Sequence, residues 1–263
     1  MTWHDVGELA RCTSLLAPGA LVFASHLPNQ TWHQTVDTCV AIRNLGFEPV
    51  PHLPARRLAD RAELDRVAAD LAREARVSRA LLIAGDAPQP LGPFHASLDV
   101  LATGVLARHG IQRLFVAGHP EGHPVLSEDE LRRAEREKLA FAAAHGFELA
   151  FLTQFFFDAA PFVRWARMLR GQGVDARLVA GLAGPARAST LFKYALRCGV
   201  GASIRALGAR PAQLSRLVGE RDPGAIVRAI AAERAAGLSE IGIHLFSFGG
   251  LERTCAWLNA LAT

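Results

Sequence analysis

The chain has 263 residues, half of them hydrophobic, and a formal net charge of +4 at pH 7. This length suits either two small domains or one large α/β barrel, and the 23 Gly and 14 Pro are spread along the chain, which favours a single domain over residues 1–263. The charge comes from interspersed Arg and Glu, as in residues 128–138, rather than from a basic block with aromatics. This pattern disfavours a nucleic-acid partner and still suits an anionic small molecule.

The four cysteines, Cys12, Cys39, Cys198 and Cys255, lie far apart and form no CxxC pair. We therefore expect free thiols rather than a zinc site or a disulfide scaffold. The N-terminus lacks the basic start and apolar run of a signal peptide, and no stretch reaches the roughly 18 apolar residues of a membrane span. These features predict a cytoplasmic protein without a membrane partner.

Short apolar runs alternate along the chain with longer amphipathic segments. We expect strands at Ala20–Ser25, Pro49–Leu53, Ala80–Ala84, Arg113–Ala117, Leu149–Thr153, Ala176–Ala180 and Glu240–Phe246. We expect helices at Thr31–Leu45, Asp60–Ala75, Phe94–His109, Glu128–His145, Ala160–Gln172 and Pro223–Ala236, and a helical stretch with a Gly-rich break within Ala186–Leu207. This alternation predicts an α/β fold with parallel strands and right-handed crossovers.

The predicted strands number seven, whereas a closed (β/α)8 barrel of the TIM type has eight. A doubly wound open sheet is the competing architecture. Its phosphate-binding fingerprint GxGxxG is missing from the first strand-to-helix turn, Ser25–Gln30. The pattern therefore favours a barrel that is one strand short of the closed form.

Polar residues follow most of the predicted strands, and the carboxyl ends of parallel strands meet at one rim where ligands bind. These residues are Ser25, His26, His52, Gly85, Asp86, Gly118–His123, Thr153, Gln154, Gly181 and His244. Asp86 can tune a heteroaromatic ring electrostatically or exchange a proton. The alternative is a helix N-cap, which Pro88, Pro90 and Pro93 disfavour because they keep the next helix several residues away.

Two further strand ends suggest ligand contacts. His119, Glu121 and His123 lie in a turn-rich HPEGH loop, which differs from the helical HExxH of zinc enzymes, so we expect ligand contact and no metal, with a self-satisfied loop as the alternative. The amide of Gln154 can pair with the edge of a pterin while the neighbouring Phe155 supplies a stacking face. The alternative is that the Phe run is core and Gln154 meets water. His52 suits a cofactor contact and a backbone hydrogen bond equally well.

Taken together, these segments resemble the methylenetetrahydrofolate reductase family over nearly the whole chain. The motifs are Pro51-His52-Leu53, Gly85-Asp86, Gly118–Pro124 and Thr153–Asp158, in the family's order and approximate spacing. The resemblance implies an eight-stranded barrel that binds FAD along its rim, takes a hydride from NADH or NADPH and delivers it to a tetrahydrofolate derivative.

The resemblance also implies roles for individual residues. Asp86 matches the acidic residue beside the flavin and pterin, and Gln154 matches the folate-binding glutamine. The positions that match flavin contacts are Ser25, His52, Gly85, Ala96, His119, His123 and, in a helix about one turn longer than usual, Lys138.

The chain departs from the family at several positions. The family's first strand carries a Glu that protonates the folate, and nothing before Ala20 resembles it, so Asp5–Leu16 is expected to be the helix that follows that strand. Glu121 and His26 are then the candidate general acids. Other departures are Ala84 in place of an Arg, Phe248-Gly249-Gly250 in place of an Asn, and no stacking aromatic near Arg205–Arg210.

Three functions remain open. The first is a folate-dependent oxidoreductase that interconverts 5,10-methylenetetrahydrofolate and 5-methyltetrahydrofolate. The second is a non-reductive folate-binding protein, or a subunit that needs a partner, because a barrel short of one strand exposes two edges that favour a homo-oligomer or a partner subunit. The third is a reductase that passes hydride from NADH to folate without flavin.

Overall fold

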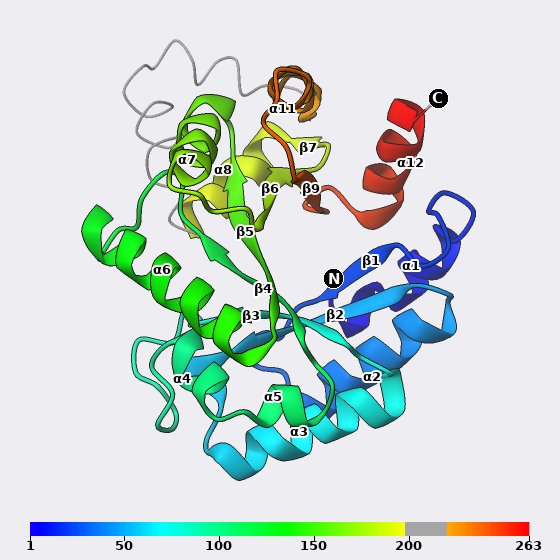
Figure 1. The fold of residues 1–263 in the computed structure, drawn as a ribbon. Coiled ribbons are helices and arrows are strands. Elements are labelled where there is room, and N and C mark those ends of the chain that lie inside the picture. The colour runs from blue at the N-terminus through cyan, green and yellow to red at the C-terminus, as the bar shows by residue number, and fades with distance from the viewer. Residues whose placement is uncertain (198–219, 263) are drawn as a thin grey trace. The chain divides into compact units, whose positions relative to one another are not determined.

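The computed structural model describes residues 1–197 and 220–262, and Figure 1 shows the arrangement of its elements. The helices are η1 Trp3–Asp5, α1 Val6–Arg11, α2 Trp32–Asn44, η2 Ala55–Arg57, α3 Arg61–Ala75, α4 Ser97–Ala102, α5 Val105–Arg108, α6 Glu128–His145, α7 Ala159–Gly171, α8 Ala188–Arg197, α11 Gly224–Ala235 and α12 Leu251–Ala262. The strands are β1 Leu21–Ala24, β2 Glu48–Pro54, β3 Arg79–Ile83, β4 Arg113–Gly118, β5 Glu148–Phe156, β6 Arg177–Ala183, β7 Ala186–Arg187, β8 Glu220–Arg221 and β9 Ile241–Phe246.

Seven of the described strands form one sheet in the order β1-β2-β3-β4-β5-β6-β9. The pairs β1–β2, β2–β3, β3–β4, β5–β6 and β6–β9 are parallel. All seven predicted strands are confirmed, with ends that move by three residues at most. The α/β fold class is therefore confirmed. The sheet of the described residues has seven strands, one fewer than a complete (β/α)8 barrel. The predicted break at Cys198–Gly201 and the segment Arg205–Arg210 lie outside the described residues.

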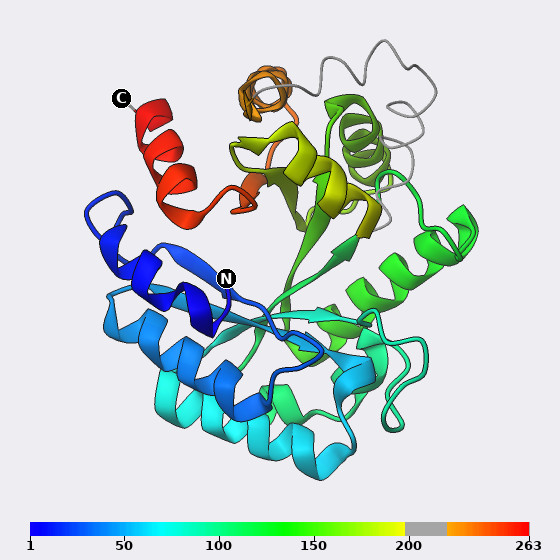
Figure 2. The ribbon, with the colours of Figure 1, turned by 180° about the vertical axis from the view of Figure 1, so that it is seen from behind.

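Contacts divide the chain into two compact units, one comprising Met1–Val116 with Lys138–Leu149 and the other Ala117–Glu137 with Ala150–Thr263. In the first unit, α2 and α3 lie side by side along strands β1 to β3, as the two opposite views in Figures 1 and 2 show. The face of α3 that packs inward consists of Leu64, Val67, Ala68, Leu71 and Ala75. This stripe follows the helical period that the sequence shows.

The first residues continue the parallel sheet beside β1. The amino group of Met1 donates to the carbonyl oxygen of Phe23 at 2.7 Å, and the N–H of Ser25 donates to the carbonyl oxygen of Met1 at 2.8 Å. These two bonds have the pattern of a parallel bridge. Helices η1 and α1 follow at once, which confirms the helix expected within Asp5–Leu16, although α1 ends earlier, at Arg11.

In the second unit, β5, β6 and β9 pair in parallel, and helices α7 and α11 contact each other. The contact between these helices includes an ion pair between Arg167 and Glu233 at 2.6 Å. A short antiparallel pair, β7 with β8, stands apart from the main sheet. Neither this pair nor helix α12 was predicted from the sequence.

The helices begin where polar caps satisfy their first N–H groups. Thr31 and Gln34 form a reciprocal capping box at α2, and Ser127 and Glu130 form another at α6. Asp158, the last residue of the Thr153–Asp158 motif, accepts a hydrogen bond from the N–H of Ala160 at 2.9 Å and caps α7. Asp158 therefore has a structural role at the end of the motif.

The predicted helix Phe94–His109 is two short helices, α4 and α5. The break falls at Gly104, whose φ of 70° places it in the left-handed region that only glycine adopts readily. Helix α4 begins at Ser97 because both His95 N–H and Ala96 N–H donate to the carboxylate of Asp99. The late start of α4 confirms that Asp86 is not a helix N-cap.

Two observations concern the surface and the thiols. Among the described residues, no helix has the length and apolar character needed to cross a bilayer. Cys12, Cys39 and Cys255 are buried, and burial raises the pKa of the Cys39 thiol to about 12. Cys198 lies outside the described residues.

Candidate functional site

The loops that follow β2 and β3 in the first unit are held together by their backbones. The N–H of Arg56 donates to Ala84, the carbonyl of Arg56 accepts from Leu91, and the Arg56 guanidinium donates to the carbonyls of Ala87 and His95. Arg56 thus fixes the course of the loop between β3 and α4. The predicted strand-end residues Gly85 and Asp86 are part of this fixed loop.

Two glycines allow these loops to approach so closely. Gly85 has a φ of 92°, and a Cβ there would lie 2.9 Å from the Cβ of Pro54. A Cβ on Gly92 would lie 2.0 Å from the carbonyl oxygen of Ala59. A side chain at either position would force the loops apart, so Gly85 has a backbone role in addition to any ligand contact.

Asp86 and Arg57 form the ion pair of this strand end. The Arg57 Nη2 atom lies 3.0 Å from the Asp86 Oδ1 atom, and the side chain of Arg57 is 20% exposed whereas that of Asp86 is 80% exposed. The carboxylate is therefore presented to solvent at the end of β3, as predicted. Sequence reasoning missed Arg57, because an arginine one turn after a strand carries no signal of its partner.

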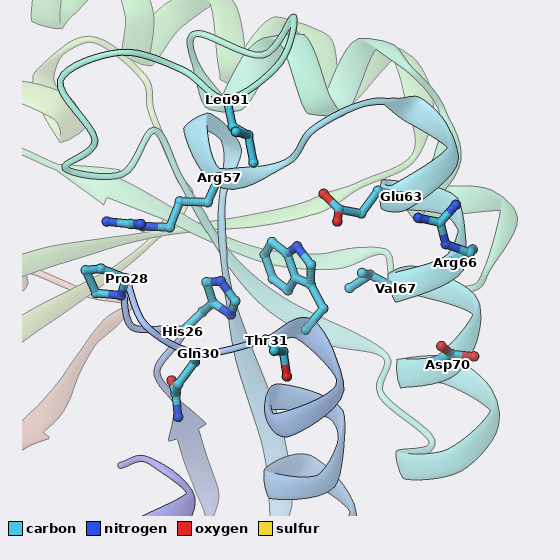
Figure 3. A pocket seen from close by; sticks show the side chains of 11 residues that line it. His26, Pro28, Gln30, Thr31, Arg57, Glu63, Arg66, Val67, Asp70 and Leu91 are labelled. Carbon is cyan, nitrogen blue, oxygen red and sulfur yellow. The ribbon is translucent and has the colours of Figure 1, made fainter.

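A pocket of about 460 Å³ adjoins this pair. Figure 3 shows it between the β1–α2 loop, the start of α2 and helix α3. Its lining residues are His26, Pro28, Gln30, Thr31, Trp32, Arg57, Glu63, Arg66, Val67, Asp70 and Leu91. Figure 3 places His26 and Arg57 together and the charged side chains of α3 apart from them.

His26 is fixed on two sides. Its Nδ1 atom lies 2.9 Å from the hydroxyl of Thr35, and its ring stacks on Trp32 with 3.8 Å between the ring centroids. Burial, and secondly the charge of Arg57, lower the pKa of His26 from 6.5 to about 4. At neutral pH the imidazole is uncharged, which argues against His26 as the general acid.

Acidification is expected to destabilise the protein through His26. The unfolded chain takes up a proton on this residue near pH 6.5 whereas the folded chain resists until about pH 4, so the free energy of unfolding falls as the pH drops through that window. NMR titration of the imidazole and urea unfolding at pH 7 and pH 5 test this. H26Q should remove part of the pH dependence. H33Q, which changes a histidine on α2 with an 81% exposed side chain, is the matched control. An imidazole that titrates at 6.5 in the folded protein would contradict the prediction.

The other flavin-matching residues of the first unit lie in or next to its strands and helices. Ser25 follows β1 directly, and its N–H donates a hydrogen bond to the carbonyl oxygen of Met1. His52 is in β2, level with Leu81 of β3, and its ring meets that of Phe23 edge to face at 6.1 Å. Ala96 directly precedes α4. Lys138 is half-buried on α6, one turn after Glu135.

The HPEGH loop of the second unit is a tight turn at the end of β4. The N–H of Gly122 donates to the carbonyl of His119 at 3.2 Å, with Pro120 at the second position and a φ of 82° at Gly122. The His119 and His123 rings meet edge to face at 5.4 Å. The Nδ1 atom of His123 accepts weak hydrogen bonds from the N–H groups of Val125 and Leu126 at 3.3 Å. The loop therefore brings both imidazoles together.

A buried polar network supports this loop. Arg132 Nη2 donates to the carbonyl of His119 at 3.3 Å, and Arg132 Nη1 lies 2.9 Å from Glu135 Oε2. The other carboxylate oxygen of Glu135 accepts from Trp165 Nε1 at 3.1 Å, and the Arg132 and Glu135 side chains are 10% and 3% exposed. The indole edge of Trp165 packs so close to Gly118 that a Cβ there would lie 2.7 Å away. The network thus connects α6 and α7 to the end of β4.

The loop and the network line a pocket of about 680 Å³. Its polar lining consists of His119, Glu121, His123, Glu128, Arg132 and Arg164, and its apolar lining includes Trp165, Met168, Leu126 and Leu131. The described residues contain no cluster of three or more side chains suited to a metal ion. Arg132 is already paired with Glu135, so Arg164 is the guanidinium of this lining that can pair with an anionic group, beside the Glu121 and Glu128 carboxylates and the Trp165 indole.

Gln154 lies at an irregularity in β5. The register with β6 shifts between Leu152 and Phe155, so Thr153 and Gln154 bulge out of the regular ladder. On β6, a Cβ at Gly181 would lie 2.3 Å from the carbonyl oxygen of Thr153, and the N–H of Gly181 donates to the Thr153 hydroxyl at 2.9 Å. The bulge leaves Gln154 exposed between buried neighbours, and bulges of this kind often re-aim a side chain beside an active site.

Phe155 is 1% exposed and forms the base of an aromatic cluster. The partly buried rings that pack against the buried cluster around it are Phe157, Tyr194, Phe246 and Phe248. Phe248 lies 4.8 Å from Phe155 and stacks on Tyr194 at 4.2 Å. The loop that carries Phe248 contacts the carbonyl oxygen of Pro185 at Gly249, where an added Cβ would lie 2.0 Å from that oxygen. Gly249 therefore allows the close contact that holds Phe248 in place. The outer rings of the cluster, rather than Phe155 itself, are accessible.

The predicted residues form a small group in each unit. In the first unit the loops after β2 and β3 place Gly85 and Asp86 beside Arg57, and in the second unit one loop holds His119, Glu121 and His123. The supporting residues Arg57, Arg132, Glu135 and Trp165 were not found from the sequence. Their roles depend on contacts between elements far apart in the chain.

Comparison with known proteins gives a partial similarity. No family model matches the chain. The chain is 30% identical over 151 residues to a protein named 5,10-methylenetetrahydrofolate reductase from Pectobacterium carotovorum subsp. carotovorum, a stretch that covers 57% of this chain and 48% of that protein. The chain thus spans about half the length of the curated relative that it matches. The similarity is to the same family that the ordered motifs resemble.

Proposed function

We propose that this protein is a folate-dependent oxidoreductase that interconverts 5,10-methylenetetrahydrofolate and 5-methyltetrahydrofolate. The observation that carries the proposal is the β5 bulge, which leaves the Gln154 amide exposed toward the carboxyl end of a parallel strand. Ligands of parallel α/β folds bind at that end. The similarity to a protein named 5,10-methylenetetrahydrofolate reductase supports the same class of reaction.

Gln154 and Asp86 have different roles in this proposal. The Oε1 atom of Gln154 accepts a hydrogen bond from the N–H of Phe155 at 3.1 Å, which leaves its second lone pair and the two amide N–H donors to match the acceptors and donors along the edge of a pterin. The outer rings of the aromatic cluster around Phe155 supply a stacking surface, and one of them, Phe157, is three residues from Gln154 in the sequence. The exposed carboxylate of Asp86 favours a positively charged iminium form of the folate electrostatically.

The hydride donor in this proposal is FAD, NADH or NADPH. The pocket beneath the HPEGH loop fits the charged part of such a nucleotide, because Arg132 and Arg164 provide positive charge and Trp165 provides an aromatic wall. The residues proposed to hold a flavin are Ser25, His52, Gly85, Ala96, His119, His123 and Lys138. A bound flavin would supply the two-electron redox chemistry that amino-acid side chains lack.

Glu121 is the proposed proton donor of the chain. It is half-buried and lines the same pocket as His119 and His123, so it lies where a ligand can reach it. His26 is uncharged at neutral pH and is less suited to this role. Proton donation requires Glu121 to come within hydrogen-bond reach of the substrate nitrogen.

A second function is a non-reductive folate-binding protein or a subunit that needs a partner. The observation that favours it is exposed apolar surface on the last strand and helix of the second unit. Ile243 in β9 and Leu258 and Leu261 in α12 are 42%, 42% and 48% exposed. Exposed apolar groups on a strand and a helix near it in sequence suit contact with another chain or a second copy.

The absorbance spectrum of freshly purified protein, followed by NADH and NADPH consumption with methylenetetrahydrofolate, tests the proposal. A flavin spectrum with folate-dependent oxidation supports the oxidoreductase. Activity without a flavin spectrum identifies a reductase that passes hydride directly from the nicotinamide. A colourless protein that binds methyltetrahydrofolate and oxidises neither nucleotide supports the second function.

Replacement of Gln154 by leucine is expected to lower kcat/KM for the folate by about 10- to 100-fold, because two hydrogen bonds of roughly 1 kcal/mol each are lost. Steady-state kinetics check this. Q172L, which changes an exposed glutamine at the other end of the following helix α7, is the control and should leave kcat/KM unchanged. Equal activity of Q154L and Q172L would remove Gln154 from the site.

A further inference from the structure

Arg57 is the charged partner of Asp86. Its Nη2 atom lies 3.0 Å from Asp86 Oδ1, and Asp86 makes no ion pair with any other side chain that the structure describes. The second carboxylate oxygen, Oδ2, is left for another contact. Arg57 and Asp86 come from different loops, 29 residues apart in the sequence.

The two partners differ in how firmly they are held. The backbone next to Arg57 is fixed because the Arg56 N–H donates a hydrogen bond to the carbonyl oxygen of Ala84, and the Arg56 guanidinium donates to the carbonyl oxygens of Ala87 and His95. The side chain of Arg57 is four-fifths buried, whereas that of Asp86 is four-fifths exposed. An exposed aspartate without a partner samples several rotamers, and a fixed guanidinium selects one of them.

We propose that Arg57 is a positioning residue that holds the Asp86 carboxylate in one orientation, with Oδ1 on the guanidinium and Oδ2 directed to the bound substrate. This inference rests on the proposed function, in which Asp86 acts electrostatically on the folate. A carboxylate that is already oriented stabilises a developing positive charge without reorganising during the reaction. Loss of Arg57 therefore affects turnover more than substrate affinity.

Arg57 has a second, measurable effect on its surroundings. It lines the pocket that contains His26, and Figure 3 shows both side chains there. The charge of Arg57 contributes, after burial, to the lowered pKa of His26. The pKa of His26 in the protein without ligand therefore reports where the charge of Arg57 lies.

A double-mutant cycle tests the proposal with R57Q, D86N and the combined variant. In the wild-type background, R57Q is expected to lower kcat about tenfold and to change KM by less than about threefold. In the D86N background, R57Q should change kcat by less than about twofold, because Arg57 acts through Asp86. R57K should restore part of the loss. R73Q, an exposed arginine on α3, is the control and should leave kcat unchanged.

The outcomes separate this inference from the proposed function. A wild-type protein that neither oxidises NADH with the folate nor binds methyltetrahydrofolate overturns both. A wild-type protein that binds the folate without turnover overturns the effect of Arg57 on kcat that the inference predicts. Effects of R57Q that are equal in the wild-type and D86N backgrounds overturn the positioning role alone. In the protein without ligand, R57Q should raise the pKa of His26 measured by NMR, and an unchanged pKa means that Arg57 does not lie where the inference needs it.

Discussion

Replacement of Glu135 by alanine is expected to destabilise the second unit by about 3–5 kcal/mol, the usual cost of leaving one member of a buried ion pair without its partner. Glu135 is 3% exposed, and its carboxylate lies against Arg132 and accepts from Trp165. The variant leaves a buried guanidinium charge and an indole N–H without an acceptor. Urea unfolding followed by tryptophan fluorescence measures the loss.

Three variants make this test specific. E135Q keeps an oxygen for Trp165 but removes the charge that faces Arg132, so it should also destabilise. R132M combined with E135M removes both charges and should recover most of the stability. D70A, which breaks an ion pair with Arg73 on the surface of α3, should cost less than about 1 kcal/mol. If E135A lowers the free energy of unfolding by no more than D70A does, the network does not support the loop.

The second large effect is expected at Gly181. In G181A the new Cβ would lie 2.3 Å from the carbonyl oxygen of Thr153, a distance that no real contact tolerates, so the β5 bulge has to move. We expect a destabilisation of about 2–3 kcal/mol from overpacking, together with loss of folate-dependent activity because Gln154 is re-aimed. Urea unfolding and steady-state kinetics measure the two effects.

Gly171 provides a matched control in the same unit. It is the last residue of α7, its φ is not positive, and a Cβ there would meet nothing within 4 Å. G171A should therefore be neutral or stabilise the protein by up to about 1 kcal/mol. A G181A variant as stable and active as G171A would show that the bulge is not needed to present Gln154.

The two units carry different functional groups. The strand ends of the first unit carry a carboxylate paired with a guanidinium, near a histidine that stays uncharged at neutral pH. The second unit carries an amide on a bulged strand, and a pocket lined by two imidazoles, two carboxylates and two guanidinium groups.

The sequence alone determined the order and type of most elements, because each strand is a short apolar run and each long helix has an apolar stripe. Strand β2 was recognised by its apolar run although it contains Pro49, Pro51 and Pro54. Proline is unusual in a strand that, like β2, pairs with a neighbour on each side. Helix α12 was missed. The predicted helix Phe94–His109 was too long, because the local pattern does not show that Gly104 turns the chain.

The sequence also located Ser25, Gly85 and Asp86 just after their strands, whereas Gln154 and Gly181 lie inside strands β5 and β6, which run three residues further than predicted. Only the tertiary structure decided how those residues are held. Arg57 meets Asp86, Trp165 meets Glu135, and Gly181 gives room to the bulge at Gln154 through contacts between segments 28 to 30 residues apart. Such contacts leave no periodic signal in the chain. They arise from the register of neighbouring strands and the crossing of loops, which a linear sequence does not display.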